Sequence, residues 1–177
     1  ISELIEYYKG IFTILSSCAS RQLEEVTFRR STIQVSDLFE YAAKYFRRVS
    51  KGKRTGVELM IEPMEGRVIG DINQLRFLLE NLIDEALDRS ENGILKLSAR
   101  EDEEYVRFLF TDTRREKSVE ELNQLFYPNL ARMTAGEKGE LRGTEYLICK
   151  QIIRDHDEFA GRRGCRINAE PAVGGGF

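Results

Sequence analysis

The sequence contains few of the residues that mark a familiar reaction centre. Its 177 residues include no tryptophan, one histidine, three prolines and three cysteines. No apolar run approaches the roughly 18 residues that a membrane-spanning helix needs, and no signal peptide opens the chain. The cysteines are scattered without a CxxC pair, which argues against a zinc site or a disulfide framework and indicates a reducing, cytoplasmic setting.

The charge balance gives no sign of a nucleic-acid partner, because the formal net charge is −3. Hydrophobic residues make up 41% and charged residues 32% of the chain, as in a globular domain with a sizeable core. The HExxH, GxSxG, P-loop and GxGxxG patterns are all missing, so hydrolase and Rossmann functions have no support. The first residue is isoleucine, from which we expect a fragment of a longer protein.

A long amphipathic helix is predicted at the start of the chain, over residues 2–27. Its apolar side chains recur at steps of three and four, at Leu4, Tyr8, Ile11, Leu15, Cys18, Leu23 and Val26. That spacing is typical of helices packed along a seam. One helix cannot bury such a stripe alone, so we expect it to pair with a helix from upstream or from a second chain. The alternative is a helix that folds back on its own domain.

Residues 31–177 are predicted to form a second unit in which helices alternate with strands. Strands are expected at Ser31–Val35, in "TGVELMIEP" and "GRVIGD" around a turn at Met64–Gly66, in the hairpin "GILKLSAR" and "YVRFLFTD" across Glu101–Glu104, and in "GCRINAEP". Helices are expected after a cap at Ser36 or Asp37, after a cap at Asp71, over Ser118–Phe126 and over Tyr146–His156, with a loop or lid at 129–143. This order predicts an α+β fold, a two-layer α/β sandwich with a mixed, mostly antiparallel sheet against helices.

The segment "LRFLLENLIDEA" and the aspartate before it resemble the N box of the catalytic ATP-binding domain of sensor histidine kinases, a Bergerat-fold group shared with gyrase and mismatch-repair ATPases. Asn81 matches the first asparagine of that box. Glu85 stands where the family has the asparagine that holds Mg²⁺, and Asp88 stands where it has a lysine. The three side chains are at i, i+4 and i+7, so they share one helix face. Without the resemblance, they would be read as a solvated polar face.

The strand that ends in "FTDTRRE" is similar to the family's next element, a strand ending in DxGxG whose aspartate binds the adenine amino group. Asp112 matches that aspartate, while Arg114 and Glu116 replace the glycines that let the backbone approach the base. A guanidinium at Arg114 would occupy the adenine slot and pair with Asp112. Read without the family, Asp112 is a residue that ends a strand and initiates a turn.

Two later segments extend the resemblance. Phe126 and Pro128 fit the family's F box, and "LRGTEYLICKQIIRDH" is similar to its glycine-rich helix start. There Gly143 is kept, whereas Glu145 replaces a glycine and places a negative charge where a triphosphate would lie, at a cost of about 1 kcal/mol in water. The same glutamate, near a helix N-terminus, interacts favourably with the helix dipole and so stabilises the fold without ligand.

His156 matches a histidine that commonly ends the last helix of this family's catalytic domain. We interpret it as a helix C-terminal residue rather than a phosphoacceptor. A phosphoacceptor histidine in the parent protein would therefore lie before Ile1. The closing segment, "GRRGCRINAEPAVGGGF", is similar to the end of the family's domain at Gly164, Ile167 and Phe177.

The resemblance implies the cytoplasmic C-terminal module of a bacterial two-component sensor histidine kinase or a kinase-like signalling protein. The dimerisation helix would occupy residues 1–30 and the ATPase-fold domain residues 31–177. The degenerate ATP-site positions are Asn81, Glu85, Asp112, Arg114, Glu116, Gly143 and Glu145. We expect no catalytic residue, no bound cofactor, no nucleic acid and no direct membrane contact in this fragment. Its expected partners are a second copy, through the N-terminal helix, and a response regulator or kinase domain.

Two other functions stay open at this point. One is an active, ATP-dependent histidine kinase domain, in which Glu85 would carry Mg²⁺ through its carboxylate oxygens. The other is a structural dimerisation module without any ligand. The family is one of protein kinases, but its Mg²⁺, adenine and phosphate positions are replaced here while its core positions match. That pattern favours loss of kinase and ATPase activity in this fragment.

Overall fold

A computed structural model describes the greater part of the chain. The described residues are 28–53, 56–88, 91–127, 134–135, 141–142 and 144–177, together with Leu4, Ile5, Tyr8, Lys9 and Phe12. Those five N-terminal residues are helical and exposed. The rest of the helix predicted over residues 2–27 lies outside the described residues. Within the described residues, no helix is both long and apolar enough to cross a membrane.

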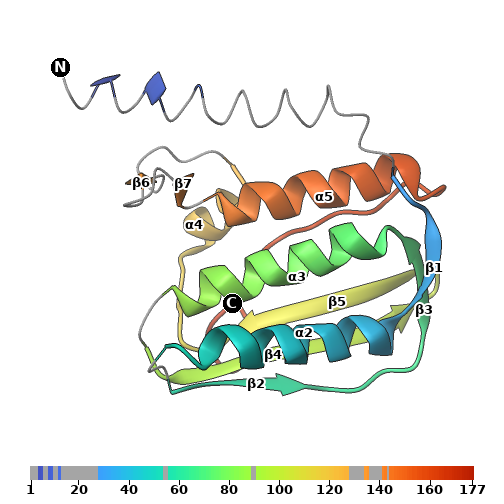
Figure 1. Cartoon of the computed structure of the whole chain (residues 1–177), viewed down its shortest axis with the longest axis horizontal. Helices are drawn as coiled ribbons and strands as arrows, with labels where there is room; N and C mark the ends of the chain where they lie inside the picture. Colours follow the sequence, from blue (N-terminus) through green and yellow to red (C-terminus); the bar gives the residue numbers. More distant parts are fainter. Residues whose placement is uncertain are drawn as a thin grey trace.

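Helices and a sheet form two layers, and the predicted α+β sandwich is confirmed. The sheet has the order β2 (Val57–Ile61), β4 (Gly93–Asp102) and β5 (Tyr105–Asp112). The three longest described helices are α2 (Val35–Ser50), α3 (Ile72–Leu87) and α5 (Glu145–Phe159). Figure 1 shows α2 and α3 lying over the sheet, with α5 on the side of α3 that faces away from α2.

The sheet is mixed, as predicted, and its register fixes where the strands end. β2 pairs in parallel with β4, and β4 forms the predicted antiparallel hairpin with β5. The two strands predicted around Met64–Gly66 are both present, but they belong to different sheets. The second of them, β3 (Arg67–Gly70), pairs antiparallel with β1 (Ser31–Gln34) instead. Register places Asp112, at the end of β5, opposite Leu95 of β4.

One predicted helix start is confirmed and one is wrong. Asp71 caps α3, because its carboxylate accepts hydrogen bonds from the backbone N–H groups of Asn73 and Gln74. By contrast, α2 starts at Val35, before the predicted caps at Ser36 and Asp37, and it has no side-chain cap. Val35 is completely buried, so packing of the first turn against the core extends the helix past the polar cap signal.

The structure differs in detail from three other predictions made from the sequence. The helix predicted over Ser118–Phe126 is shorter: α4 spans Val119–Asn123 behind a capping box of Ser118 and Glu121. The segment "GCRINAEP" forms no strand, although exposed and half-buried residues alternate along it. Its first two N–H groups bind the Asp157 carboxylate instead of a neighbouring strand. Most of the predicted loop at 129–143 lies outside the described residues, but it includes two paired strands, β6 (Thr134–Ala135) and β7 (Leu141–Arg142).

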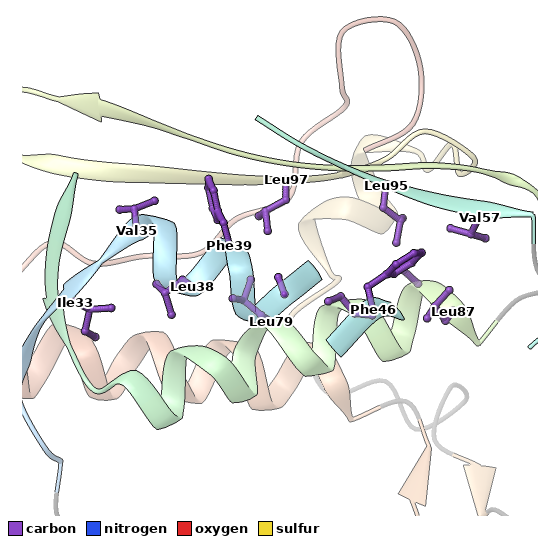
Figure 2. Packing of buried hydrophobic residues seen from close by; sticks show 13 residues of the cluster. Ile33, Val35, Leu38, Phe39, Phe46, Val57, Leu79, Leu87, Leu95 and Leu97 are labelled. Carbon is purple, nitrogen blue, oxygen red and sulfur yellow. The ribbon is translucent and has the colours of Figure 1, made fainter. Parts of the chain in front are cut away.

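The hydrophobic core lies between the sheet and the two helices that cover it. Figure 2 shows Leu95 and Leu97 pointing from the strand layer toward the helices, while Phe39 of α2 points toward the strands. These residues and Ile83 of α3 are 4% exposed or less. Each buried side chain of this size contributes about 1.5–3 kcal/mol by leaving water. Helix α3 is therefore held firmly against the sheet, and its C-terminal half lies near the end of β5.

The single histidine joins α5 to the start of α3. His156 is 4% exposed, its Nδ1 lies 2.8 Å from the Ile152 carbonyl oxygen, and the backbone N–H of Asp71 donates to its Nε2 over 3.1 Å. An acceptor Nε2 requires the neutral ring with its proton on Nδ1. Burial lowers the pKa of His156, although Asp71 and Asp155 act in the opposite direction.

We expect the domain to lose stability in mild acid because of this ring. A lowered pKa means that the unfolded chain takes up a proton first, near pH 6.5, while the folded chain stays neutral. The free energy of unfolding should therefore fall below pH 6.5, by up to about 1.4 kcal/mol per pH unit. Urea denaturation at pH 7.5, 6.5 and 5.5 measures this, and His156→Gln should remove the slope. Equal stability of the unmodified chain at all three pH values would contradict the assignment.

Candidate functional site

The end of β5 directs two consecutive arginines toward α3. Asp112 closes the strand and is 4% exposed. The next residue, Thr113, extends the ladder: its N–H and its hydroxyl both donate to the carbonyl of Ile94, over 3.1 and 2.9 Å. This fixed turn determines where Arg114 and Arg115 leave the sheet. Both side chains are almost completely buried, with 3% and 4% of their surface exposed.

Arg114 forms a two-point ion pair with Asp112. Its Nε donates to Oδ1 over 2.8 Å and its Nη2 donates to Oδ2 over 2.7 Å, while its backbone N–H also reaches Oδ1. The remaining donors bind the carbonyls of Ala86 and Glu91 over 2.6 and 2.9 Å. The pairing that the sequence suggested is therefore present. Its hydrogen bonds with Asp112 raise the pKa of Arg114 above its ordinary value.

Gly93 makes room for the Arg114 side chain. A Cβ atom built at Gly93 would lie 2.1 Å from Cγ of Arg114 and 2.6 Å from its Cδ. Any larger residue at the start of β4 would therefore collide with the arginine. The position of Arg114 depends on two sites that are distant in the sequence, the carboxylate of Asp112 and the bare backbone of Gly93.

Arg115 connects the two carboxylates of the site. Its Nη1 donates to both carboxylate oxygens of Glu85, over 2.9 and 2.7 Å, and its Nη2 donates to the Glu85 carbonyl. Its Nε lies 3.4 Å from Oδ2 of Asp112. Arg115 was not among the site residues predicted from the sequence. The available signal was a second cation three residues after the strand-end carboxylate Asp112, since a buried arginine requires a charged partner.

Tyr146, in the first turn of α5, completes the site and was also missed. Its hydroxyl donates to Oε2 of Glu85 over 2.7 Å, and its ring meets Phe126 edge-on at 5.7 Å between centroids. Burial and the adjacent Glu85 raise the pKa of Tyr146, so the hydroxyl keeps its proton and remains a donor. We call Glu85, Asp112, Arg114, Arg115 and Tyr146 the ion-pair network.

The other predicted site residues have different surroundings. Asn81 is buried, and its amide donates to the carbonyl of Phe77 one turn earlier in α3. Glu116 is exposed, and Glu145 is the partly buried first residue of α5. Gly143 lies outside the described residues. Of the predicted residues, the structure thus brings Glu85, Asp112 and Arg114 into the one network.

The donor set of this network does not fit Mg²⁺ or an adenine amino group. Four N–H groups from Arg114 and Arg115 surround the Asp112 carboxylate. Both oxygens of Glu85 accept from Arg115, and one of them also accepts from Tyr146. Mg²⁺ prefers carboxylate oxygens that no cation already neutralises. In the described part of the chain, no cluster of three or more histidine, cysteine or acidic side chains is arranged to hold a metal.

The fold is similar to solved catalytic domains of histidine kinases. The Acinetobacter baumannii histidine kinase AdeS superimposes with a TM-score of 0.54 at 18% identity, over 86% of this chain and 66% of that one. The catalytic domain of histidine kinase ThkA gives 0.56 at 20% identity, over 72% and 81%. The cytoplasmic segment of histidine kinase QseC gives 0.53 at 16% identity, over 96% and 87%. At these identities the likeness concerns the fold alone.

The amino-acid sequence also places the chain in a protein family. No curated protein matches the chain. Residues 70–177, however, match the family described as histidine kinase-, DNA gyrase B-, and HSP90-like ATPase. The match covers more than half of the chain and includes α3, β4, β5 and α5, the elements that carry the ion-pair network. The chain therefore belongs to the histidine kinase-, DNA gyrase B- and HSP90-like ATPase family.

Proposed function

We propose that the chain is the C-terminal module of a sensor histidine kinase, or of a kinase-like two-component signalling protein, whose nucleotide site is degenerate. In this proposal residues 1–30 are a dimerisation helix and residues 31–177 an ATPase-fold domain, both in the cytoplasm. The module acts by dimerising and by docking a response regulator or another kinase domain. It has neither kinase nor ATPase activity of its own.

The observation that carries this proposal is the buried pair of Arg114 and Asp112. A nucleotide could reach the Asp112 carboxylate only by displacing a guanidinium that also binds the carbonyls of Ala86 and Glu91. The displaced arginine would lose hydrogen bonds to charged and neutral acceptors together, and such bonds contribute about 0.5–3 kcal/mol each. Adenine offers no carboxylate to replace them. The closed site is thus more stable than the opened one.

We expect the chain not to bind ATP measurably. Calorimetric titration, or titration with a fluorescent ATP analogue at millimolar Mg²⁺, should give no saturable binding in the micromolar range. Arg114→Gly with Glu116→Gly should not restore binding by itself, because the charge of Glu145 would still face the triphosphate. Adding Glu145→Gly removes that charge. Saturable micromolar binding by the unmodified chain would favour the active kinase instead, with Glu85 carrying Mg²⁺.

Exposed apolar residues support the proposed homodimer. Leu4, Ile5, Tyr8 and Phe12 are helical, and 48–73% of the surface of each is exposed. Positions 4, 8 and 12 follow one another at about one turn, and position 5 lies about 100° round the axis from position 4, so the four side chains fall on one side of the helix. An apolar helix face of this kind is buried in stable proteins by packing against another helix.

We expect the chain to be dimeric and to lose this state when that face is made charged. Leu4→Asp with Phe12→Asp should convert the dimer to a monomer in analytical ultracentrifugation. Deleting residues 2–27 should also abolish capture of a response regulator. Lys9→Ala, on the same helix, serves as a surface control for both measurements. A charged variant that stays dimeric would contradict the dimerisation helix, and a dimer that captures no regulator would favour the purely structural module.

A further inference from the structure

The ion-pair network joins three elements that are far apart in the sequence. Arg115, just after β5, and Glu85 of α3 are 30 residues apart, and Glu85 and Tyr146 of α5 are 61 residues apart. All of these contacts converge on the carboxylate of Glu85.

We propose that the ion-pair network is an internal clamp, which holds the first turn of α5 against α3 and β5 without any bound nucleotide. Arg115 ties Glu85 to the end of β5, and the Tyr146 hydroxyl ties α5 to the same carboxylate. Glu85, Asp112 and Arg114, which stand at predicted nucleotide-site positions, thereby help to position α5 in place of a bound nucleotide. The inference rests on the proposed absence of nucleotide binding.

The charges within the clamp balance one another. It contains the two cations Arg114 and Arg115 and the two carboxylates Asp112 and Glu85, and all four side chains are at least three-quarters buried. A buried charge is tolerated when it is paired and fully hydrogen-bonded. Each guanidinium faces a carboxylate, and every clamp donor but Nε of Arg115, which lies 3.4 Å from Asp112, has a hydrogen-bond partner. An added anionic or cationic ligand would therefore disturb the charge balance rather than complete it.

The β5 side of the clamp is anchored independently. Asp112 and Phe177 exchange two backbone hydrogen bonds, with N···O distances of 2.8 and 3.2 Å. A Cβ atom at Gly176 would lie 2.1 Å from the Asp112 carbonyl oxygen, so this approach of the two segments requires glycine. With α3 fixed by the core and β5 by Phe177, the clamp acts on the first turn of α5, while buried Cys149, Ile152 and His156 hold its later turns.

Tyr146 allows the clamp to be tested without disturbing the buried charges, because it is the only uncharged residue of the ion-pair network. Tyr146→Phe keeps the ring against Phe126 and leaves the three ion pairs of the network intact, but it removes the hydrogen bond between α5 and Glu85. We expect hydrogen exchange of the first α5 amides, such as that of Ile148, to become about tenfold faster, which corresponds to about 1.4 kcal/mol. Amides of the central strand, such as that of Leu97, should exchange as before.

Two controls make the result specific to the clamp. Tyr105→Phe removes a hydroxyl that donates to the Arg163 carbonyl, outside the network, and should leave α5 exchange unchanged. Glu85→Gln should accelerate α5 exchange, and adding Tyr146→Phe to it should have little further effect, because both changes break the same contact. The matched control Glu58→Gln, which is exposed on β2, should have none.

The outcomes separate the clamp from the proposed function. Unchanged exchange in Tyr146→Phe, equal acceleration in α5 and β4, or fully additive effects of Glu85→Gln and Tyr146→Phe would each overturn the clamp. Slower exchange of the α5 amides of the unmodified chain on adding ATP with Mg²⁺ would instead overturn the proposed loss of nucleotide binding.

Discussion

Replacing Asp112 with alanine should destabilise the domain by about 3–5 kcal/mol, the range found when one partner of a buried ion pair is removed. Asp112 is the acceptor for three N–H groups of Arg114 and lies 3.4 Å from Nε of Arg115. Without the carboxylate, both guanidinium groups remain buried, and Arg115 keeps Glu85 as its one anionic partner. Urea denaturation at pH 7.5 measures the loss.

Two further variants test the cause of this loss. Asp102→Ala breaks an ion pair with Arg107 in which each side chain is at least half exposed, and it should cost about 1 kcal/mol or less. Adding Arg114→Ala to Asp112→Ala removes one of the stranded cations and should recover part of the stability. A loss below 1 kcal/mol for Asp112→Ala would contradict a structural role for this residue. An aspartate kept for reading adenine would affect ligand binding and leave stability nearly unchanged.

Replacing Asp71 with alanine is expected to have the second-largest effect, a loss of about 2–4 kcal/mol. Its carboxylate accepts from the N–H groups of Asn73 and Gln74 at the start of α3 and from the N–H of Arg29, which precedes β1. The side chain thus joins the helix start to the segment that enters the domain. Because Asp71 is 5% exposed, water cannot readily replace these bonds.

The matched variant for this test is Asp71→Asn, which keeps an acceptor oxygen at the cap position. It should lose less than alanine, about 1–2 kcal/mol, because its one oxygen keeps the cap bonds to Asn73 and Gln74 while its amide nitrogen replaces the oxygen that accepts from Arg29. Thermal or urea unfolding at pH 7.5, where His156 is neutral in both states, avoids the contribution of that ring. If alanine and asparagine were equally destabilising, the cap bonds to Asn73 and Gln74 would not be the main contribution of this side chain.

Local signals predicted those parts of the fold in which neighbouring residues decide the structure. The apolar spacing after Asp71, its cap and the hairpin across Glu101–Glu104 all appear as predicted. The start of α2 did not follow its local signal, because burial of Val35 outweighed the polar residues behind it. The segment from Gly164 also did not form the predicted strand, since a strand requires a neighbour to complete its hydrogen bonds and Asp157 binds its first two N–H groups.

The sequence by itself determined the α+β class, the order of most elements and the likeness to the histidine kinase family, because periodicity, caps and motif spacing are local properties. It also indicated that Arg114 would pair with Asp112, two residues away. Only the tertiary structure decided that Arg115 and Tyr146 would meet on Glu85, and that Gly93 would leave space for the Arg114 side chain. Those contacts join residues up to 61 positions apart, and they depend on how α3, β5 and α5 pack, which no local pattern encodes.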